Sequence, residues 1–387
     1  MKQLSIFFIA VLFSFSSMAK TGLDNSITLE AQTSVSNAVK YLISKQNAEN
    51  GSWGPYGGLP AISALAATAI ATSADAPKYK KELEKVQNYL LSFAQADGSI
   101  KEDSEKSYPN YTTSLAVVAL YLIDKEKNKD VILKARKWLK SSQFTATSGA
   151  TPVEFGGIGY GSTKSKSDLS NTQMALEALF VTHEMEVENA TPEEMKETKA
   201  VWKRAETFLN RCQALPTTND LAWAKTATGE DIGGFIYSPD RTKVEDESGA
   251  LRTYASMTYA GLKSMIYAGY ISDNKLNKED PRVKAALSWA GKHYTLDENP
   301  GMKLQGHYYY INTFAKALDA YGADSIKDKD GKDRMWRRDV VKKLLSLQAA
   351  DGHWVNPEGR WMENNPEMVT AYALMSMNHA LSKVAAK

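Results

Sequence analysis

Two kinds of apolar pattern alternate along the chain. In the first kind, apolar residues recur at helical spacing, as in Tyr79, Leu83, Val86, Leu90 and Phe93, while lysines and glutamates fill the other positions. This pattern is typical of amphipathic helices that bury one face and expose the other. Six such segments are predicted, and they end at Gln46, Ala94, Gln143, Gln213, Tyr294 and Gln348.

The second kind of segment is rich in alanine and apolar on most faces. A helix of that composition is buried on all sides. Six of these segments alternate with the first six, and they begin near Pro60, Asn110, Asp168, Arg252, Tyr309 and Pro366. The sequence therefore predicts pairs of antiparallel helices, with six half-exposed outer helices and six buried inner helices.

The connections between the helices are of two sorts. Links from inner to outer helices are charged, as in 124–129 and 327–333, and are predicted to be solvated turns. Links from outer to inner helices are rich in glycine and aromatic residues. Because alternating antiparallel helices place all loops of one sort at the same end, we expect one plain end and one functional end.

The turns that follow the outer helices carry a recognisable motif. Segments 46–54 (QNAENGSWG) and 348–354 (QAADGHW) resemble the Gln-to-Trp repeats of squalene–hopene and oxidosqualene cyclases, and 96–100 is a weaker copy. Periodicity alone fits an open solenoid or a closed ring. The resemblance, which extends to exported bacterial proteins with prenyltransferase and squalene-oxidase repeats, implies an all-α (α/α)6 toroid in a single domain over 20–387. We interpret the motif residues themselves as structural.

One inner segment begins with a run that corresponds to the acid motif of the cyclases. Cyclases of this kind begin an inner helix with Asp-x-Asp-Asp-Thr, whose middle aspartate protonates the alkene, and the matching run here is Asp168-Leu169-Ser170-Asn171-Thr172. Neither serine nor asparagine is an acid near neutral pH. Ordinary squalene cyclisation is therefore not expected. Asp168 is the candidate catalytic residue, and the alternative is that it only caps the helix.

Several other chemistries of related ring folds lack their motifs. The sequence has no Asp-Asp-x-x-Asp run for magnesium and no Gly-Cys-Gly-Glu-Gln thioester motif. Its one cysteine, Cys212, falls in an outer segment, which does not suit the zinc site of protein prenyltransferases. We therefore expect no metal and no other cofactor. The net charge of +2 gives no reason to expect nucleic acid as a partner.

Aromatic and amide side chains collect in the glycine-rich loops. Such side chains suit stacking on sugars, on an isoprenoid chain or on a cation, and they equally suit packing of the loops. Trp53, Tyr56, Tyr160 and Tyr237 belong to these loops. The free amides of the inner helices favour a polar or anionic group at the same end. The predicted ligand-binding residues are Tyr111, Asn171, Arg252, Tyr254, His307, Tyr308, Trp361 and Glu363.

The first residues have the composition of an export signal. A basic start at Lys2 precedes an apolar run over 4–15, and Ser17 and Ala19 fit a cleavage site after Ala19. We expect residues 1–19 to be removed and the mature protein to be periplasmic or secreted, without a membrane span. A membrane anchor is the alternative interpretation of this segment.

Three classes of function remain open. The first is a divergent terpenoid-cyclase-like enzyme that acts on an isoprenoid in the ring. The second is an exported polysaccharide lyase or hydrolase on the same ring, and the third is a binding protein without catalysis. Each predicts a small-molecule or oligosaccharide ligand within the ring. An apolar lining of the first turns of the inner helices would favour the isoprenoid, and paired carboxylates about 5–10 Å apart across the mouth of the ring would favour glycoside chemistry.

Overall fold

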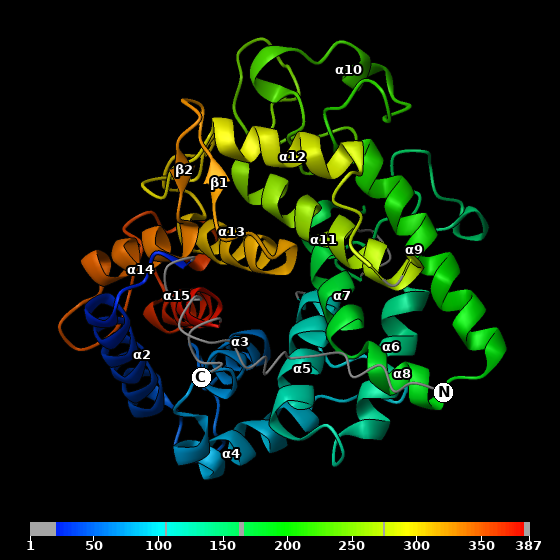
Figure 1. The fold of residues 1–387 in the computed structure, drawn as a ribbon. Helices are drawn as coiled ribbons and strands as arrows, with labels where there is room; N and C mark the ends of the chain where they lie inside the picture. Colours follow the sequence, from blue (N-terminus) through cyan, green and yellow to red (C-terminus); the bar gives the residue numbers. More distant parts are fainter. Residues whose placement is uncertain (1–20, 105–106, 162–165, 274, 383–387) are drawn as a thin grey trace.

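The helices form two concentric layers around one axis (Figure 1). The computed structural model describes residues 21–104, 107–161, 166–273 and 275–382. The inner layer consists of α3 (Pro60–Ala71), α5 (Pro109–Asp124), α7 (Leu169–Val181), α11 (Ala255–Asp273), α13 (His307–Tyr321) and α15 (Pro366–Leu381). The outer layer consists of α2 (Asn25–Lys45), α4 (Lys80–Leu91), α6 (Lys129–Ser141), α9 (Pro192–Cys212), α12 (Pro281–Lys292) and α14 (Trp336–Leu347).

The ring is closed. Each inner helix packs against the next, and the last inner helix, α15, packs against both α3 and α2. The first and last outer helices also meet, because α14 contacts α2. The prediction of a toroid with six outer and six inner helices is confirmed, and the open solenoid is excluded. The predicted export signal lies outside the described residues.

The burial pattern explains the two layers. The outer helix α6 buries Ile132, Ala135, Arg136 and Leu139, which lie on one face at helical spacing. The inner helix α7 instead buries every residue from Leu169 to Leu179. Proline at the start of α3, α5 and α15 sets the first turn without losing a hydrogen bond.

Some smaller elements were not predicted from the sequence. They lie in the connections and include a hairpin in which Ile326 pairs with Arg334. None of the described helices is long and apolar enough to cross a membrane. The additional elements are α8 (His183–Asn189), α10 (Ala222–Lys225), β1 (Ile326–Lys327), β2 (Asp333–Arg334) and 3-10 turns at Ala76–Tyr79, Ala146–Ser148, Gly229–Asp231 and Arg360–Met362.

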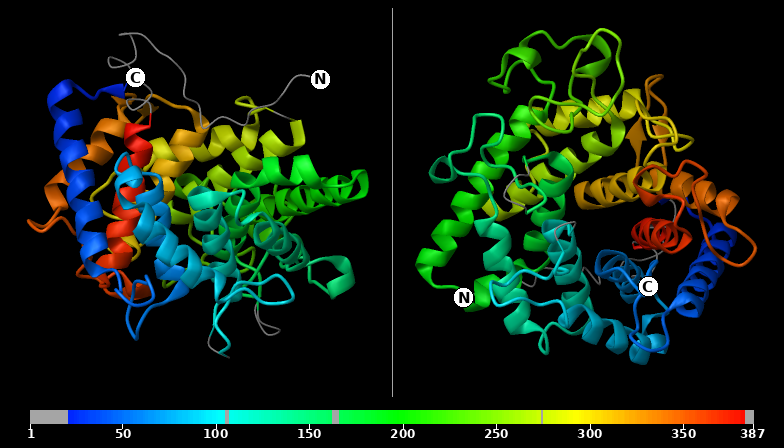
Figure 2. Two further views of the ribbon diagram at one scale, coloured as in Figure 1. Left: turned by 90° about the horizontal axis from the view of Figure 1, so that it is seen from below. Right: turned by 180° about the vertical axis from the view of Figure 1, so that it is seen from behind.

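All six inner helices begin at the same end of the ring, which we call the loop end (Figure 2). The glutamines that end four of the outer helices organise the turns there. Each Nε2 donates to a carbonyl of its own turn and to a carbonyl of the next outer helix, at 2.9–3.0 Å. The acceptor pairs are Gly51 and Glu82 for Gln46, Gly156 and Val201 for Gln143, Gly233 and Arg282 for Gln213, and Gly352 and Ser34 for Gln348.

The last of these turns joins the end of the chain to its beginning. Gln348 follows α14, yet its amide donates to the Ser34 carbonyl of α2 at 3.0 Å. Gly352 of the same turn has a φ of +98°, and a Cβ there would lie 2.5 Å from the Asn37 carbonyl oxygen. Only glycine lets the turn approach α2 this closely. Trp354 then donates from Nε1 to the Leu344 carbonyl of α14 at 2.8 Å, which holds the turn on its own helix.

We expect Gln143→Ala to destabilise the protein by roughly 1–3 kcal/mol, because two buried carbonyls lose their donor. The Gln143 side chain is buried and also accepts from Arg204 Nε at 2.7 Å. The matched control is Gln95→Ala, whose exposed side chain reaches only the carbonyls of Phe93 and Lys101 in its own turn. Urea denaturation of both variants measures the effect, and equal losses of stability would contradict the role of the glutamine between helices.

Candidate functional site

Asp168 lies at the start of α7, at the loop end of the ring. Its Oδ1 accepts from the Asn171 backbone N–H and its Oδ2 from Asn171 Nδ2, both at 2.8 Å. The flanking backbone is fixed by two loops, since Asp168 N donates to the Ile158 carbonyl at 3.3 Å and Leu169 N donates to the Tyr237 carbonyl at 2.7 Å. Asp168 therefore caps the helix, and only 1% of its surface is exposed.

Two tyrosine hydroxyls lie near the Asp168 carboxyl. The Tyr237 hydroxyl is close enough to act on the pKa of Asp168, and it lies 3.3 Å from the Tyr160 hydroxyl. Burial raises the pKa of Asp168 to about 6, although the hydrogen bonds from Asn171 and the nearby Tyr237 hydroxyl act in the opposite direction. Among the described residues Asp168 forms no ion pair. Its carboxyl can thus gain or lose a proton close to neutral pH.

A second chain of hydroxyls crosses the ring beside Asp168. Tyr111 of α5 and Ser170 of α7 have their side-chain oxygens 2.6 Å apart. Ser170 Oγ is also 3.1 Å from the hydroxyl of Tyr309 on α13, to which Gln173 Nε2 donates at 3.2 Å. Tyr111 and Tyr309 are half-buried. We call Asp168, Tyr111, Tyr160, Ser170, Tyr237 and Tyr309 the Asp168 site.

The middle of the ring is filled by charged side chains. Lys263 Nζ donates to Gln173 Oε1 at 2.6 Å and to Glu177 Oε2, and Lys316 Nζ donates to Glu177 Oε1 at 2.6 Å. Burial lowers the pKa of Lys263 to about 8, against the opposing charge of Glu177. Burial alone would raise the pKa of Glu177, but the two lysines outweigh it and hold that pKa well below its usual range.

The cavity beside this cluster is very small. It has a volume of about 10 Å³ and is lined by residues of α3, α5, α7, α13 and α15, including Leu65, Met174, Glu177, Lys316 and Met375. That volume holds about one water molecule. In the described structure the depth of the ring therefore has no room here for an isoprenoid chain.

Two of the predicted ligand-binding residues hold the loops together. Arg252 pairs with Asp231 at 2.8 Å and with Asp246 at 3.2 Å. The buried His307 ring is 2.9 Å from the Leu296 carbonyl, and burial lowers its pKa. We assign Arg252 and His307 to structure rather than to the ligand.

Glu363 has a comparable structural position. Its carboxylate accepts from the backbone N–H groups of Tyr308 and Tyr309, at 3.2 and 2.8 Å, and from Asn356 Nδ2 at 2.7 Å. It therefore caps the first turn of α13 from a loop that lies 54 positions after Tyr309 in the sequence. Tyr308 is 3% exposed and belongs to the core.

Tyr254 and Trp361 lie in different environments. Tyr254 is buried at the start of α11, and its backbone N–H donates to the Phe235 carbonyl at 3.2 Å, two residues before Tyr237 of the Asp168 site. Trp361 is 47% exposed, with the Arg360 guanidinium carbon 4.5 Å from its ring centroid. Its φ of +57° is left-handed. Such a conformation costs about 1–3 kcal/mol in a residue other than glycine and is concentrated at ligand sites.

The sequence analysis missed Tyr309 and Lys243. Tyr309 is the middle residue of Tyr308-Tyr309-Tyr310, and neighbouring helical residues point in different directions, so only one of the three faces the axis. Tyr308 and Tyr310 are 3% and 0% exposed, whereas Tyr309 is half-buried and is the one that faces the axis. Lys243 lies in a long loop without a motif, where only the folded structure brings it to Tyr237, 4.3 Å from the ring centroid.

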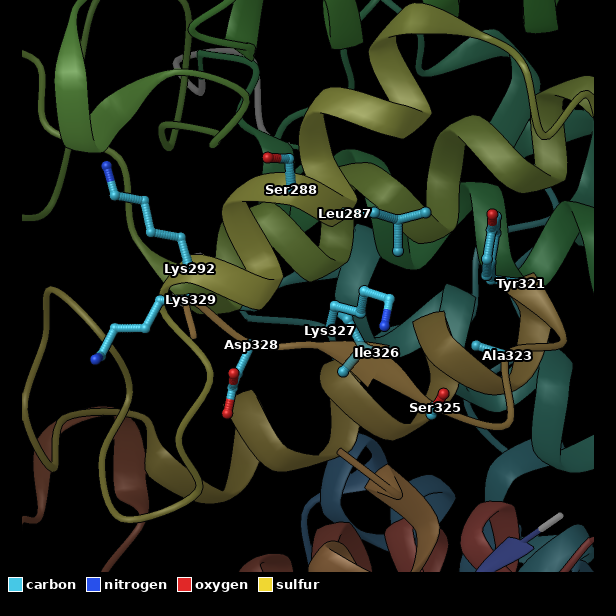
Figure 3. A pocket seen from close by; sticks show the side chains of 10 residues that line it. All are labelled: Leu287, Ser288, Lys292, Tyr321, Ala323, Ser325, Ile326, Lys327, Asp328 and Lys329. Atoms are coloured by element: carbon cyan, nitrogen blue, oxygen red, sulfur yellow. The ribbon is translucent and has the colours of Figure 1, made fainter. Parts of the chain in front are cut away.

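A larger hollow of about 640 Å³ lies between α12 and β1, away from the Asp168 site (Figure 3). Its volume is in the range of ligand pockets. The lysines at its edge already have partners, however, since Lys292 pairs with Glu230 at 2.9 Å and Lys329 with Asp330 at 2.9 Å. These charged side chains are therefore occupied by surface ion pairs, and the Asp168 site is the better candidate for a functional site.

Comparison with known proteins identifies the architecture. No protein-family model matches the chain, and no curated protein sequence matches it either. Among solved structures, glycoside hydrolase family 76 (mannosidase) Bt3792 from Bacteroides thetaiotaomicron is 11% identical, with a TM-score of 0.58 over 92% of this chain and 98% of its own. The fold is an α/α toroid.

A second group of similar structures has a different chemistry. The type II terpene cyclase MstE from Scytonema, bound to geranylgeranyl dihydroxybenzoate as substrate, is 13% identical, with a TM-score of 0.54 over 92% of this chain and 99% of its own. The first group also contains the GH76A alpha-1,6-mannanase from Salegentibacter sp. HEL1_6, which is 10% identical, with a TM-score of 0.56 over 92% of this chain and 100% of its own. At these identities the toroid is shared with both groups, and the activity follows from neither.

We expect the free energy of unfolding to fall as the pH rises from about 4 to about 6, through the titration of Asp168. The folded pKa is raised above its usual value, so the folded state binds the proton more tightly and loses that advantage above pH 6. The size is on the order of 3 kcal/mol. Denaturant titrations of wild type and Asp168→Asn across this range isolate the effect, and the same slope in both proteins would contradict it.

Proposed function

We propose that the protein binds a carbohydrate at the loop end of its ring and that Asp168 transfers a proton during a reaction on that ligand. One observation carries the proposal. Polar hydroxyls and a titratable carboxyl gather at the loop end, whereas the Lys263–Glu177–Lys316 cluster fills the middle of the ring. A ligand rich in hydroxyl groups fits the first environment, and a long apolar ligand fits neither.

Aromatic rings at the loop end supply stacking surfaces for a sugar. The Tyr108 ring, which belongs to a 59% exposed residue, lies 5.4 Å from the Tyr160 ring, which in turn lies 5.7 Å from the Tyr111 ring. This row leads from solvent to the Asp168 site. With Trp361 exposed in the loop before α15, the loop end combines aromatic faces with hydroxyl donors and acceptors, as sugar-binding sites require.

The acidity of Asp168 supports glycan chemistry over alkene protonation. Protonating an alkene needs a strong acid, and burial moves the pKa of Asp168 in the opposite direction. Proton transfer to or from a sugar oxygen or an activated C–H group is instead served by a carboxyl with a pKa near the working pH. The predicted export of the protein supports the same proposal, since polysaccharides are outside the cytoplasm.

The proposal is tested with the mature chain and a panel of polysaccharides, beginning with mannan because two of the similar structures are a mannosidase and an alpha-1,6-mannanase. Wild type should release oligosaccharides detectable by mass spectrometry. Asp168→Asn should lose at least about 100-fold in turnover while it keeps binding, because the side chain keeps its shape but not its acidity. The control is Asp130→Asn, an exposed carboxylate on α6.

The other function classes are distinct outcomes of this test. Binding without turnover by wild type would indicate a carbohydrate-binding protein without catalysis. Cyclised products from squalene or from another isoprenoid, lost in Asp168→Asn, would contradict the carbohydrate proposal as a whole.

A further inference from the structure

Two cationic side chains lie against the Tyr237 ring, beside the Asp168 site. Lys243 Nζ and the Arg241 guanidinium carbon lie 4.3 and 5.1 Å from the centroid of that ring. Arg360, from the loop before α15, is a third cation at the loop end. Burial lowers the pKa of the half-buried Lys243 and the charge of Arg241 lowers it further, whereas the charge of Asp168 raises it and that of Arg360 lowers it.

These cations have no carboxylate partner among the described residues. Arg204, Arg211 and Arg252, in contrast, are each ion-paired. The Arg360 guanidinium donates to the neutral Gln305 side chain and stacks on Trp361.

Two carboxylates near these cations already have partners. Asp240, next to Arg241 in the sequence, accepts from Ser238 Oγ at 2.9 Å. Asp168 accepts two hydrogen bonds from Asn171 and supplies at most one negative charge against three positive ones. Collecting like charges in a partly buried place is unfavourable unless a ligand neutralises them.

We infer that the carbohydrate of the proposed function is acidic, and that Arg241, Lys243 and Arg360 bind the carboxylates of its uronate units. The inference rests on the proposed function and adds the chemical class of the ligand. Arginine pairs with a carboxylate through two parallel hydrogen bonds, and lysine adds a point charge. The amides at the start of the inner helices favour negative charge at the same end.

The same cations would also attract a prenyl diphosphate, but the rest of the site fits a uronate better. A prenyl diphosphate needs an apolar space next to its charged head. The Asp168 site presents hydroxyls instead, and the cavity of about 10 Å³ in the ring cannot accept a polyprenyl tail. A uronate oligomer requires only charge, hydroxyl partners and stacking surfaces at the loop end.

The test is calorimetric titration of the folded mature protein with oligogalacturonate and oligoalginate, alongside neutral manno-oligosaccharides and geranylgeranyl diphosphate. At least one uronate oligomer should bind, and its affinity should fall as the salt concentration is raised. Lys243→Gln and Arg360→Gln should each weaken that binding about ten-fold. The matched control, Lys292→Gln on the outer helix α12, should leave the affinity unchanged. Thermal unfolding verifies that each variant is folded.

The outcomes separate this inference from the proposed function. If a neutral oligosaccharide binds, is turned over with loss in Asp168→Asn, and no uronate oligomer binds, the acidic class is wrong and the proposed function stands. Uronate binding that is unaffected by both Lys243→Gln and Arg360→Gln would overturn the assignment of the cations. Tight binding of geranylgeranyl diphosphate alone, lost in these variants, would overturn both proposals.

Discussion

The hydrogen bonds of four glutamine side chains connect neighbouring repeats of this ring. Each amide spans two carbonyls, one in its own turn and one in the next outer helix, so a turn cannot shift without breaking contact with its neighbour. The hydrogen bond from Gln348 to the Ser34 carbonyl joins the last repeat to the first in the same way. Because opening the ring would break the hydrogen bond between Gln348 and Ser34, these bonds favour the closed ring over an open solenoid.

Ring closure determines where chemistry can take place. It brings the polar first turns of all six inner helices to one end, where Asp168 is buried without an ion pair and acquires a pKa of about 6. The inner helices, rich in buried alanine, also lie close to one another. Lys263, Glu177 and Lys316 lie between the inner helices, beside a cavity of about 10 Å³, and the candidate site lies at the loop end.

Much of this architecture could be predicted from local patterns. The two helix classes and the Gln-to-Trp turns are periodic, and each repeat contains its own signal. Contacts between residues far apart in the sequence, in contrast, leave no periodic pattern in it. Glu363 is a loop carboxylate in the sequence but caps the start of α13 in the structure. Lys243 and Arg360 are 117 positions apart and come to the same end of the ring only through the fold, so neither the set of cations nor the role of Tyr309 could be predicted.

The toroid hosts both terpene cyclases and mannan hydrolases, so its helices do not determine the ligand. What distinguishes the two uses physically is the depth and polarity of the space at the axis. An isoprenoid needs an apolar space that extends between the inner helices, and here a buried ion-paired cluster takes that place at a high cost in desolvation. Removing Glu177 would take the ion-pair partner from the buried Lys263 and from the half-buried Lys316, so this cluster contributes to the stable fold. The proposed carbohydrate ligand depends instead on the hydroxyls and the unpaired cations of the loop end.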